Sequence, residues 1–433
     1  MYVNSELVTK IFKNNRERKD SIKIIEKPSA EMCLSCKATK LLCGKNVCPI
    51  LVNYQSWDKN RNEIESEIIQ GSSPPGVFIG HFGYPNVSIA PMVSPENKNT
   101  EILDTPELWF GKSIMEIINF RYSLVRGNIR TNVNNIQKPN KVLEQLQEIS
   151  MAEKSVDSEL QLTKKPEQTL ILSEDSQPLG PSATLKNLIT ANPSLDQRIE
   201  KAYYDRDLRA TDAVTSLYQN DVRISKIQKS LSTGSLGLGA FRKLVPTRWS
   251  ITAVDDMISL FLIKKIKDNS TVDKFTVFTL NYLDNIYLAI LSPEFWKFEW
   301  IEAWFPKTIW NQHGSEPYIM GDFETYHGKK KYANVGGCYY SSRLAATEKL
   351  NNERKQATVT ILREIHSGYF MPVGVWNVRE SVRMMFKNKP EIFDTLQEAL
   401  NFASKKLTIP IQKWIGNSTL LKDQLQQKKI TDY

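Results

Sequence analysis

The sequence predicts an α+β fold: a mixed, multi-domain globular protein with a small four-cysteine metal module near its N-terminus. The 433 residues are 41% hydrophobic and 24% charged, which is a globular composition. The length is typical of two to three domains. Segments with alternating apolar residues are interspersed with segments of helical periodicity, and four of the five cysteines lie within residues 33–48.

The N-terminal half is expected to mix helices with strands. Residues 57–70 predict a polar helix that ends at a Gly- and Pro-rich break, and Thr105-Pro106 is typical of a helix start, with the helix running to about residue 121. The other expected elements are a short strand entering a glycine-rich turn within 77–85, strands at 86–93 and 169–172, and mostly helix over 131–165. They also include a turn at 177–182, helices within 197–228 interrupted near residue 209, and a glycine turn at 232–239.

The C-terminal half is expected to begin with a β-hairpin over residues 275–291, where alternating β-branched and aromatic residues flank a short connection. Trp296, Trp300 and Trp304 recur every four residues and predict the buried face of a helix over 295–305. The other expected elements are a glycine turn at 335–337, a helix at 341–354, a strand at 359–365 and a helix at 391–406.

These elements divide into four predicted parts. They are a basic lead-in with the metal module at 1–55, an N-terminal α/β core domain at 56–270, a C-terminal α/β domain at 271–414, and a flexible, Lys- and Gln-rich tail at 415–433. No internal repeat is visible in the sequence.

The charge and hydropathy patterns restrict the class of partner. The net charge of +9 favours a polyanionic partner such as nucleic acid, although it also serves solubility. Residues 1–30 lack the apolar core of a signal peptide, and no run approaches about 18 apolar residues. We therefore expect a cytoplasmic protein with no membrane partner.

The cysteine spacing is Cys-x2-Cys-x6-Cys-x4-Cys, formed by Cys33, Cys36, Cys43 and Cys48 and followed by Pro49. Four thiolates suit a tetrahedral zinc ion and leave no open coordination position, so we expect structural Zn²⁺. An iron–sulfur cluster is the alternative, because Cys-Pro also occurs in cluster-binding loops. The distant Cys338 is expected to be a small buried residue.

The last seven residues fit the pattern Gln-x-x-aliphatic-x-x-aromatic. In one tight helical turn, Ile430 and Tyr433 would project together, with Gln427 beside them. This is the arrangement of peptides that bind the DNA polymerase sliding clamp. The second aromatic residue usual in such peptides is absent, and a polar tail without a partner is the alternative.

Candidate phosphate- or nucleic-acid-binding residues lie near glycines and aromatics, where ligands can approach the backbone and bases can stack. A structural turn histidine or a salt-bridged surface would use the same residue types. The candidates are His81, Arg121, Arg126, Arg248 and Arg343.

Several segments together resemble the archaeal Nre family of DNA repair proteins over nearly the whole chain. They are the cysteine module with its Cys-Pro ending, PPGVFIG (74–80), SLVRG (123–127), KSVD (154–157), QPLGPSA (177–183), LVPTRWSIT (244–252) and GGCYYSSR (336–343). The resemblance implies a role in DNA damage repair, a zinc-finger-like module on the four cysteines, and a clamp-binding motif at Gln427, Ile430 and Tyr433. It implies no settled enzymatic mechanism.

The expected function is therefore a DNA damage repair factor that binds the sliding clamp through its tail, contacts DNA, works with other repair proteins and is associated with the nucleoid. The alternative is an enzyme that processes nucleic acid or nucleotides, with His81, Arg126, Arg248 and Arg343 converging in one pocket. A third possibility is an adaptor whose conspicuous motifs serve packing alone.

Overall fold

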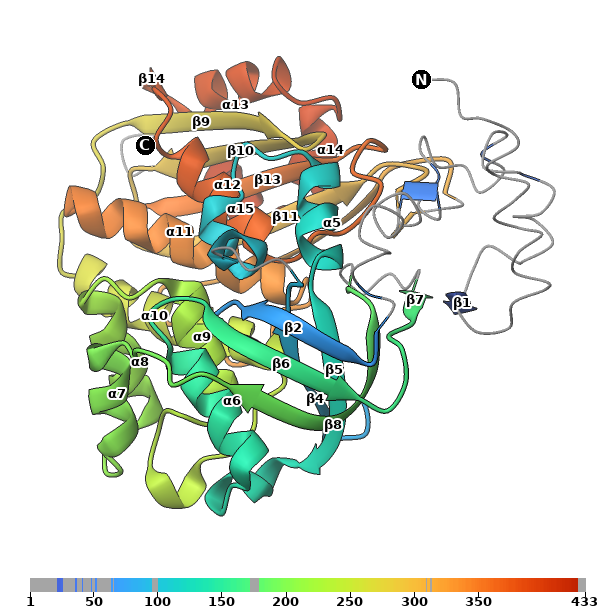
Figure 1. Ribbon diagram of the computed structural model, residues 1–433. Helices are drawn as coiled ribbons and strands as arrows, with labels where there is room; N and C mark the ends of the chain where they lie inside the picture. Colours follow the sequence, from blue (N-terminus) through green and yellow to red (C-terminus); the bar gives the residue numbers. More distant parts are fainter. Residues whose placement is uncertain are drawn as a thin grey trace. The chain divides into compact units, whose positions relative to one another are not determined.

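A computed structural model describes residues 22–25, 36, 41, 48, 51–52, 64, 66–95, 100–171, 179–308, 310–311 and 314–426. The chain divides into two compact units. Unit 1 comprises Met1–Val254 with Met371–Val373, and unit 2 comprises Asp255–Phe370 with Gly374–Tyr433. The division falls inside helix α10 (Thr247–Ile266), whereas the sequence predicts a boundary at residue 270. The mixed α+β class is confirmed, because each unit contains a six-stranded sheet (Figure 1).

The sheet of unit 1 is mixed. Strands β5 and β8 are parallel, and all other neighbours are antiparallel. In spatial order the strands are β2 (Ile68–Ser73), β6 (Val156–Leu162), β8 (Ser182–Thr190), β5 (Val125–Asn132), β4 (Asn86–Val93) and β3 (Val77–Ile79). A separate parallel pair joins β1 (Ile22–Ile25) to β7 (Gln168–Ile171).

Helix α6 (Lys141–Met151) supplies Leu143, Leu146 and Ile149 to the core of this sheet. Helix α5 (Ile114–Tyr122) begins at a capping box in which Ser113 and Glu116 bond to each other's backbone N–H. The remaining elements are α7 (Gln197–Tyr204), α8 (Ala210–Gln219), α9 (Ile224–Ser232) and the short 3-10 turns η1 (Glu101–Asp104), η2 (Pro106–Leu108), η3 (Val133–Gln137) and η4 (Gly239–Phe241).

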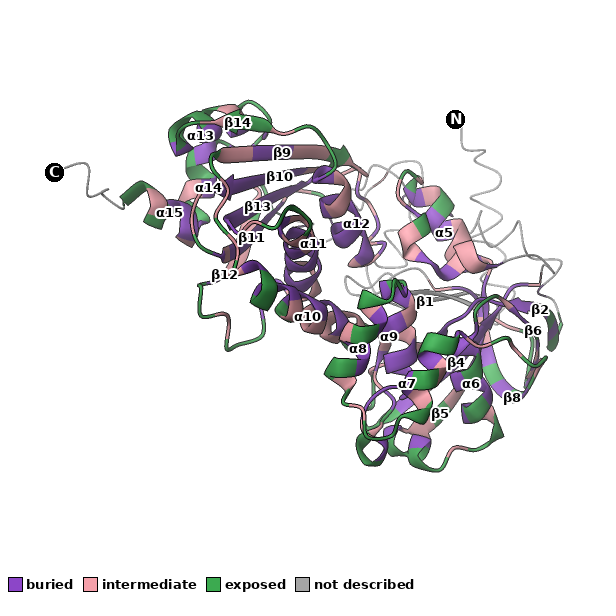
Figure 2. Ribbon diagram, turned by 90° about the vertical axis from the view of Figure 1, so that its left-hand side faces the viewer, coloured by how far each residue is buried: buried purple, intermediate pink, exposed green. Residues whose placement is uncertain are grey.

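The sheet of unit 2 has helices on both faces. Its strands lie in the order β12 (Tyr318–Glu324), β11 (Lys297–Trp304), β13 (Thr358–Ile365), β10 (Asn285–Ser292), β9 (Phe275–Tyr282) and β14 (Glu391–Phe393), with only β11 and β13 parallel. Every residue of β13 is buried, as expected of a strand covered on both sides (Figure 2).

Two hydrophobic cores separate these layers. The core on one face contains residues of α11 (Gly337–Glu353), α12 (Trp376–Met385) and the end of α10. The core on the other face contains residues of α13 (Leu396–Ser404), α14 (Ile411–Asn417) and α15 (Thr419–Gln426). Within the described residues, no helix is long and apolar enough to cross a membrane.

The C-terminal helix α15 is held by a buried carboxylate of the sheet. Glu299 on β11 accepts hydrogen bonds from the backbone N–H groups of Thr419 (2.7 Å) and Leu420 (3.3 Å), and from the hydroxyl of Ser418. Leu421 on α15 is fully buried. The predicted tail is therefore wrong for residues 415–426, which complete α14 and then form α15; residues 427–433 lie outside the described residues.

The predicted aromatic helix at 295–305 is also wrong, because these residues contain β11. A spacing of four is an even number, so it places side chains on one face of a strand as well as on one face of a helix. Trp296 and Trp300 are fully buried, as predicted, whereas Trp304 is half-buried.

Several other predicted helices also differ from the structure. The predicted helix at 57–70 lies mostly outside the described residues, and residues 68–70 belong to β2. The helix expected over 131–165 is confirmed at α6 and wrong at β6, and β5 and β8 were missed, because these strands carry many polar residues. The predicted helix at 391–406 is β14 followed by α13. The predicted helix start at Thr105 gives only η2. The β9–β10 hairpin, α11, β13, β3, β4, β7 and the helices within 197–228 are confirmed.

Candidate nucleic-acid interface

The turn between β3 and β4 exposes two large aromatic side chains. The turn is closed by hydrogen bonds from Gly80 N to Ser88 O (2.8 Å) and from Asn86 N to Gly83 O (2.9 Å). Phe82 is 80% exposed and Tyr84 is 49% exposed. Burial of such rings would be favourable, yet both remain largely exposed. The turn therefore presents apolar surface to solvent.

The start of α10 lies beside this turn. The hydroxyl of Thr247 accepts a hydrogen bond from Ile79 N (2.9 Å), which ties the first turn of α10 to the end of β3. Trp249 is 44% exposed, and its ring centroid lies 5.1 Å from that of Tyr84, with 53° between the planes. The neighbouring Arg248 is exposed. Two segments far apart in sequence therefore form one aromatic edge.

Arg130 joins the edge from the end of β5. It lies opposite Ser88 in the β4–β5 ladder and is exposed. Gly83 has a φ of +79°, and a Cβ there would lie 2.3 Å from Arg130 Nη2. The positive φ favours glycine at this position, and a side chain there would also displace the flexible Arg130 guanidinium.

An open recess of about 460 Å³ adjoins Arg130. Its lining consists of amide, hydroxyl and guanidinium groups, and the lining residues are Asn86, Arg130, Thr131, Asn132 and Asn135. Asn132 Nδ2 donates to Asn86 Oδ1 (3.0 Å), and Asn135 Nδ2 donates to Thr131 Oγ1 (3.0 Å). These bonds orient the amides while leaving each with further donor or acceptor capacity.

We call Phe82, Tyr84, Trp249, Arg130, Lys243 and Arg248, together with this recess, the aromatic–basic surface. Lys243 belongs to it because the next residue, Leu244, donates its N–H to Val133 O (3.0 Å), and Val133 N–H in turn donates to Pro85 O (3.0 Å). The segment before α10 therefore runs alongside η3 and the β3–β4 turn.

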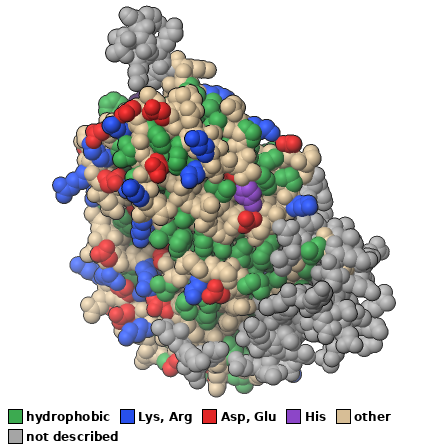
Figure 3. Space-filling model, turned by 90° about the horizontal axis from the view of Figure 1, so that it is seen from above, with side chains coloured by type: hydrophobic (Ala, Val, Ile, Leu, Met, Phe, Trp, Pro, Cys, Tyr) green, Lys and Arg blue, Asp and Glu red, His purple; other side chains and the backbone are tan. Residues whose placement is uncertain are grey.

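The surface is built from stretches that contain no aspartate or glutamate. Residues 68–95, 117–143 and 222–254 are free of both, and all 48 acidic residues of the chain lie elsewhere. Unit 2 differs: over α13 and β14, Lys/Arg and Asp/Glu side chains are interspersed (Figure 3). The stretches that form the surface therefore contribute positive charge and no carboxylate, and positive charge attracts polyanions.

Two of the predicted residues, His81 and Arg248, lie on this surface or next to it. His81 is half-buried in the β3–β4 turn, and its ring centroid lies 4.1 Å from that of Phe82. Sequence reasoning did not select Phe82, Tyr84 or Arg130. Two aromatics within a Gly- and Pro-containing turn were the available signal, because such a turn cannot bury both rings.

Arg121 and Arg126 have structural partners in unit 1. Arg121 forms an ion pair with Asp104 (2.6 Å) and lies over the ring of Trp109. Arg126 is buried and donates two hydrogen bonds to Gly180 O (3.1 and 3.2 Å). Burial lowers the pKa of Arg126 to about 10. Neither arginine belongs to the candidate interface.

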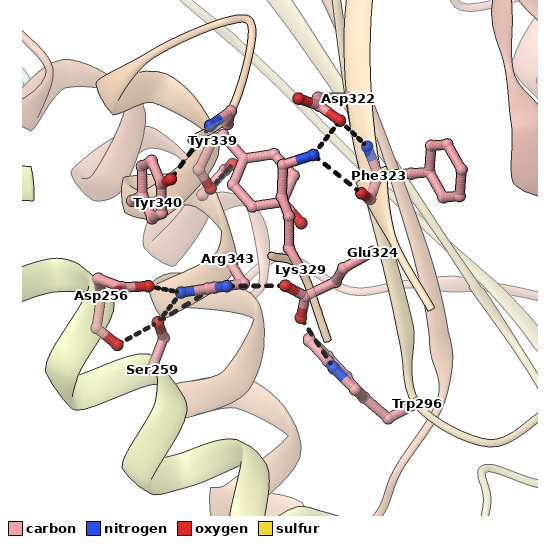
Figure 4. A network of polar contacts seen from close by, with 12 residues as sticks. Asp256, Ser259, Trp296, Asp322, Phe323, Glu324, Lys329, Tyr339, Tyr340 and Arg343 are labelled. Atoms are coloured by element: carbon pink, nitrogen blue, oxygen red, sulfur yellow. Dashed lines mark hydrogen bonds and ion pairs between the residues drawn. The ribbon is translucent and has the colours of Figure 1, made fainter. Parts of the chain in front are cut away.

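Arg343 is an internal residue of unit 2 (Figure 4). Its guanidinium donates to Glu324 (2.7 Å), to Ser259 Oγ (2.9 and 3.1 Å) and to Asp256. Trp296 Nε1 donates to the second oxygen of Glu324 (3.1 Å). Arg343 and Glu324 are both buried, and their contacts link α10, α11 and β12. The Arg343 guanidinium is therefore engaged inside unit 2 and is not exposed for binding a ligand.

The cysteine module and the C-terminal motif fall largely outside the described residues. Of the four predicted ligands, only Cys36, which is buried, and Cys48, which is half-buried, are described. Across the described part of the chain, no group of three or more His, Cys, Asp or Glu could hold a metal ion. Cys338 is half-buried in unit 2, and burial raises the pKa of its thiol to about 12.

Two mixed six-stranded sheets, one in each compact unit, define a two-unit α+β protein, and no solved structure matches the chain. Two family models do match it: "Archaeal Nre, N-terminal" over residues 42–311 and "Archaeal Nre, C-terminal" over residues 324–433. The chain belongs to the archaeal Nre family.

Curated relatives match along most of their length. The DNA repair protein NreB of Archaeoglobus fulgidus is 42% identical over 391 residues, covering 90% of this chain and 97% of the relative. The DNA repair protein NreA of the same organism is 38% identical over 376 residues, covering 87% and 93%. The DNA repair protein NreA of Haloferax volcanii is 32% identical over 373 residues, covering 84% and 89%.

Replacement of Arg343 tests its structural role. Arg343→Met leaves the buried Glu324 carboxylate without its cation, and we expect the free energy of unfolding to fall by about 3–5 kcal/mol in urea titrations. The double variant Arg343→Met/Glu324→Leu removes both charges and should recover part of the loss. The exposed Lys201→Gln is the control and should change stability by less than about 0.5 kcal/mol. A loss below about 1 kcal/mol for Arg343→Met would contradict the role.

Proposed function

We propose that this Nre-family DNA repair protein contacts DNA through the aromatic–basic surface and is held at the DNA polymerase sliding clamp by Gln427, Ile430 and Tyr433. The observation that carries the proposal is the joint exposure of cations and aromatic rings on stretches of unit 1 that contain no acidic residue. Its relatives are named DNA repair proteins, so DNA is the polyanion that such a surface would be expected to bind.

Phosphate contact is the part of this proposal that the charges support. Arg130 and Arg248 come from different elements, and the hydrogen bond between Ile79 and Thr247 ties the start of α10 to the sheet that carries Arg130. Cations held in a fixed arrangement displace the ions condensed on DNA, and that release favours binding at low salt. The two groups therefore supply affinity without specifying a base sequence.

Removal of the cations should reduce both affinity and its salt dependence. For Arg130→Gln/Lys243→Gln/Arg248→Gln, we expect weaker DNA binding in fluorescence anisotropy. The slope of log K against log salt should become shallower by about 0.7–0.9 for each phosphate that no longer meets a cation. Lys201→Gln, an exposed cation on α7, is the matched control. The DNA contact is disproved if the unmodified protein shows no salt-dependent DNA affinity.

The proposed clamp contact uses the residues directly after α15. Ile430 and Tyr433 would insert as apolar anchors, and Gln427 would hydrogen-bond beside them. Holding the protein at the clamp raises its local concentration at DNA, so weak and sequence-independent DNA contacts become sufficient. We also propose that the protein works with other repair proteins and is located at the nucleoid, where the clamp acts on DNA.

The clamp contact can be tested by calorimetry with the clamp of the same organism. Deletion of residues 427–433 should abolish binding, and Ile430→Ala or Tyr433→Ala should each cost about 2 kcal/mol or more, because central apolar anchors dominate such interfaces. Thr431→Ala lies between the anchors and should bind nearly as well as the unmodified protein. Binding that survives the deletion contradicts the proposal.

The four-cysteine module is proposed to hold structural Zn²⁺ on Cys33, Cys36, Cys43 and Cys48, with an iron–sulfur cluster as the alternative. Cysteines are suitable ligands for either group, and all four positions would be filled. The module would then stabilise a small N-terminal region and take no part in chemistry.

Elemental analysis of the purified protein tests this assignment. We expect about one zinc per chain, which Cys36→Ser should reduce and Cys338→Ser should leave unchanged, because Cys338 lies in unit 2. Iron with acid-labile sulfide in place of zinc would establish the alternative. Retention of zinc by the Cys36→Ser protein would argue against this ligand set.

A further inference from the structure

The aromatic rings on the aromatic–basic surface need an explanation beyond phosphate contact. Cations alone are sufficient to bind the DNA backbone, and an exposed ring adds nothing to that attraction. Tyr84 and Trp249 nevertheless expose 49% and 44% of their surfaces at one edge, and Phe82, in the same turn as Tyr84, is 80% exposed. Large rings that are partly open to solvent suit a flat apolar ligand.

The geometry of Tyr84 and Trp249 keeps their ring faces from covering each other fully. Their planes are inclined by 53° at a centroid separation of 5.1 Å, so neither ring is stacked flat on the other. The backbone that carries each ring is hydrogen-bonded: Trp249 N donates to Pro246 O (2.8 Å), and Asn86 N closes the turn that carries Tyr84. The two rings also contact each other, so they offer a ligand adjoining aromatic faces from two anchored segments.

The adjoining recess has the chemistry of a site for base edges. Each amide of Asn86, Asn132 and Asn135 carries both donors and an acceptor, so these amides can pair with the donors and acceptors of a base edge. The recess is open to solvent, with a volume of about 460 Å³. No carboxylate is among its lining residues, so an incoming phosphate meets no repulsion there.

From these features we infer that the aromatic–basic surface binds unpaired nucleotides of single-stranded DNA. Bases stack on Phe82, Tyr84 and Trp249, base edges enter the amide recess, and Arg130, Lys243 and Arg248 accompany the backbone. A duplex hides the faces of its bases within the stack, so it can use the cations but not the rings. This inference rests on the proposed DNA contact and narrows it to one substrate class.

The experiment compares a labelled oligothymidine with a blunt duplex of equal length, by anisotropy at one fixed salt concentration and with the full-length protein. Trp249→Leu and Tyr84→Leu should each weaken single-strand binding by roughly 5- to 100-fold, the effect of removing one stacking partner. Duplex binding should change by less than about twofold. Trp249→Phe keeps an aromatic face and should retain most of the single-strand affinity.

A matched control comes from another exposed ring of unit 1. Tyr204 on α7 is 70% exposed and lies outside the aromatic–basic surface, so Tyr204→Leu should leave both affinities unchanged. Thermal unfolding of each variant shows whether the substitution disturbs the fold. Since Trp249→Leu and Trp249→Phe replace the same side chain, a difference between them reports stacking and not packing.

The outcomes separate this inference from the proposed function. Equal losses for single strand and duplex in Trp249→Leu, or no loss in either, overturn the single-strand assignment while the salt-dependent DNA contact stands. Tighter binding of an oligouridine of equal length overturns the assignment to DNA. Absence of binding to every nucleic acid overturns both proposals and leaves an acidic protein as the partner of the surface.

Discussion

The pairing of buried charge is the constraint on which unit 2 depends. Arg379 on α12 bonds to Asp255 on α10 (2.9 Å), and Arg363 on β13 pairs with Glu302 on β11 (3.2 Å), with all four side chains almost inaccessible to water. Burial raises the pKa of Asp255, and the Arg379 guanidinium opposes that rise. An unpaired charge at any of these positions would carry a large desolvation cost. Arrangements of the helices on the sheet that separate these pairs are therefore disfavoured.

Unit 1 combines an apolar core with exposed cations. Its core is formed by apolar residues of α6 and the sheet, and cations such as Arg130 remain at the surface. The mixed sheet brings the β3–β4 turn, the end of β5 and the start of α10 together, although these segments are widely separated in sequence. Unit 2 buries Arg363 and Arg379 in ion pairs with carboxylates. In unit 1 the buried Arg126 donates to a backbone carbonyl, and Arg130 and Arg248 are exposed beside aromatic rings.

Sequence reasoning succeeded where one physical signal dominated. The β9–β10 hairpin and β13 have continuous β-branched or aromatic runs, and α11 follows a glycine turn. It failed where two periodicities coincide, as at Trp296, Trp300 and Trp304, and where polar strands resemble helices, as in β6. It also could not separate buried arginines from exposed ones: Arg126 and Arg248 lie in similar local sequences, and only the burial of Arg126 against Gly180 distinguishes them.

The capping of α15 by Glu299 limits how far the proposed clamp-binding residues can extend from unit 2. The helix ends at Gln426, and Glu299 on β11, the strand next to the edge strand β12, accepts hydrogen bonds from its first turn. Seven residues follow in the sequence, and even a fully extended chain of that length spans only about 25 Å. A clamp bound through these residues would therefore lie within one small-domain diameter of unit 2. Such a short connection would keep the bound protein next to the clamp ring, whereas a long linker would let it sample a wide volume.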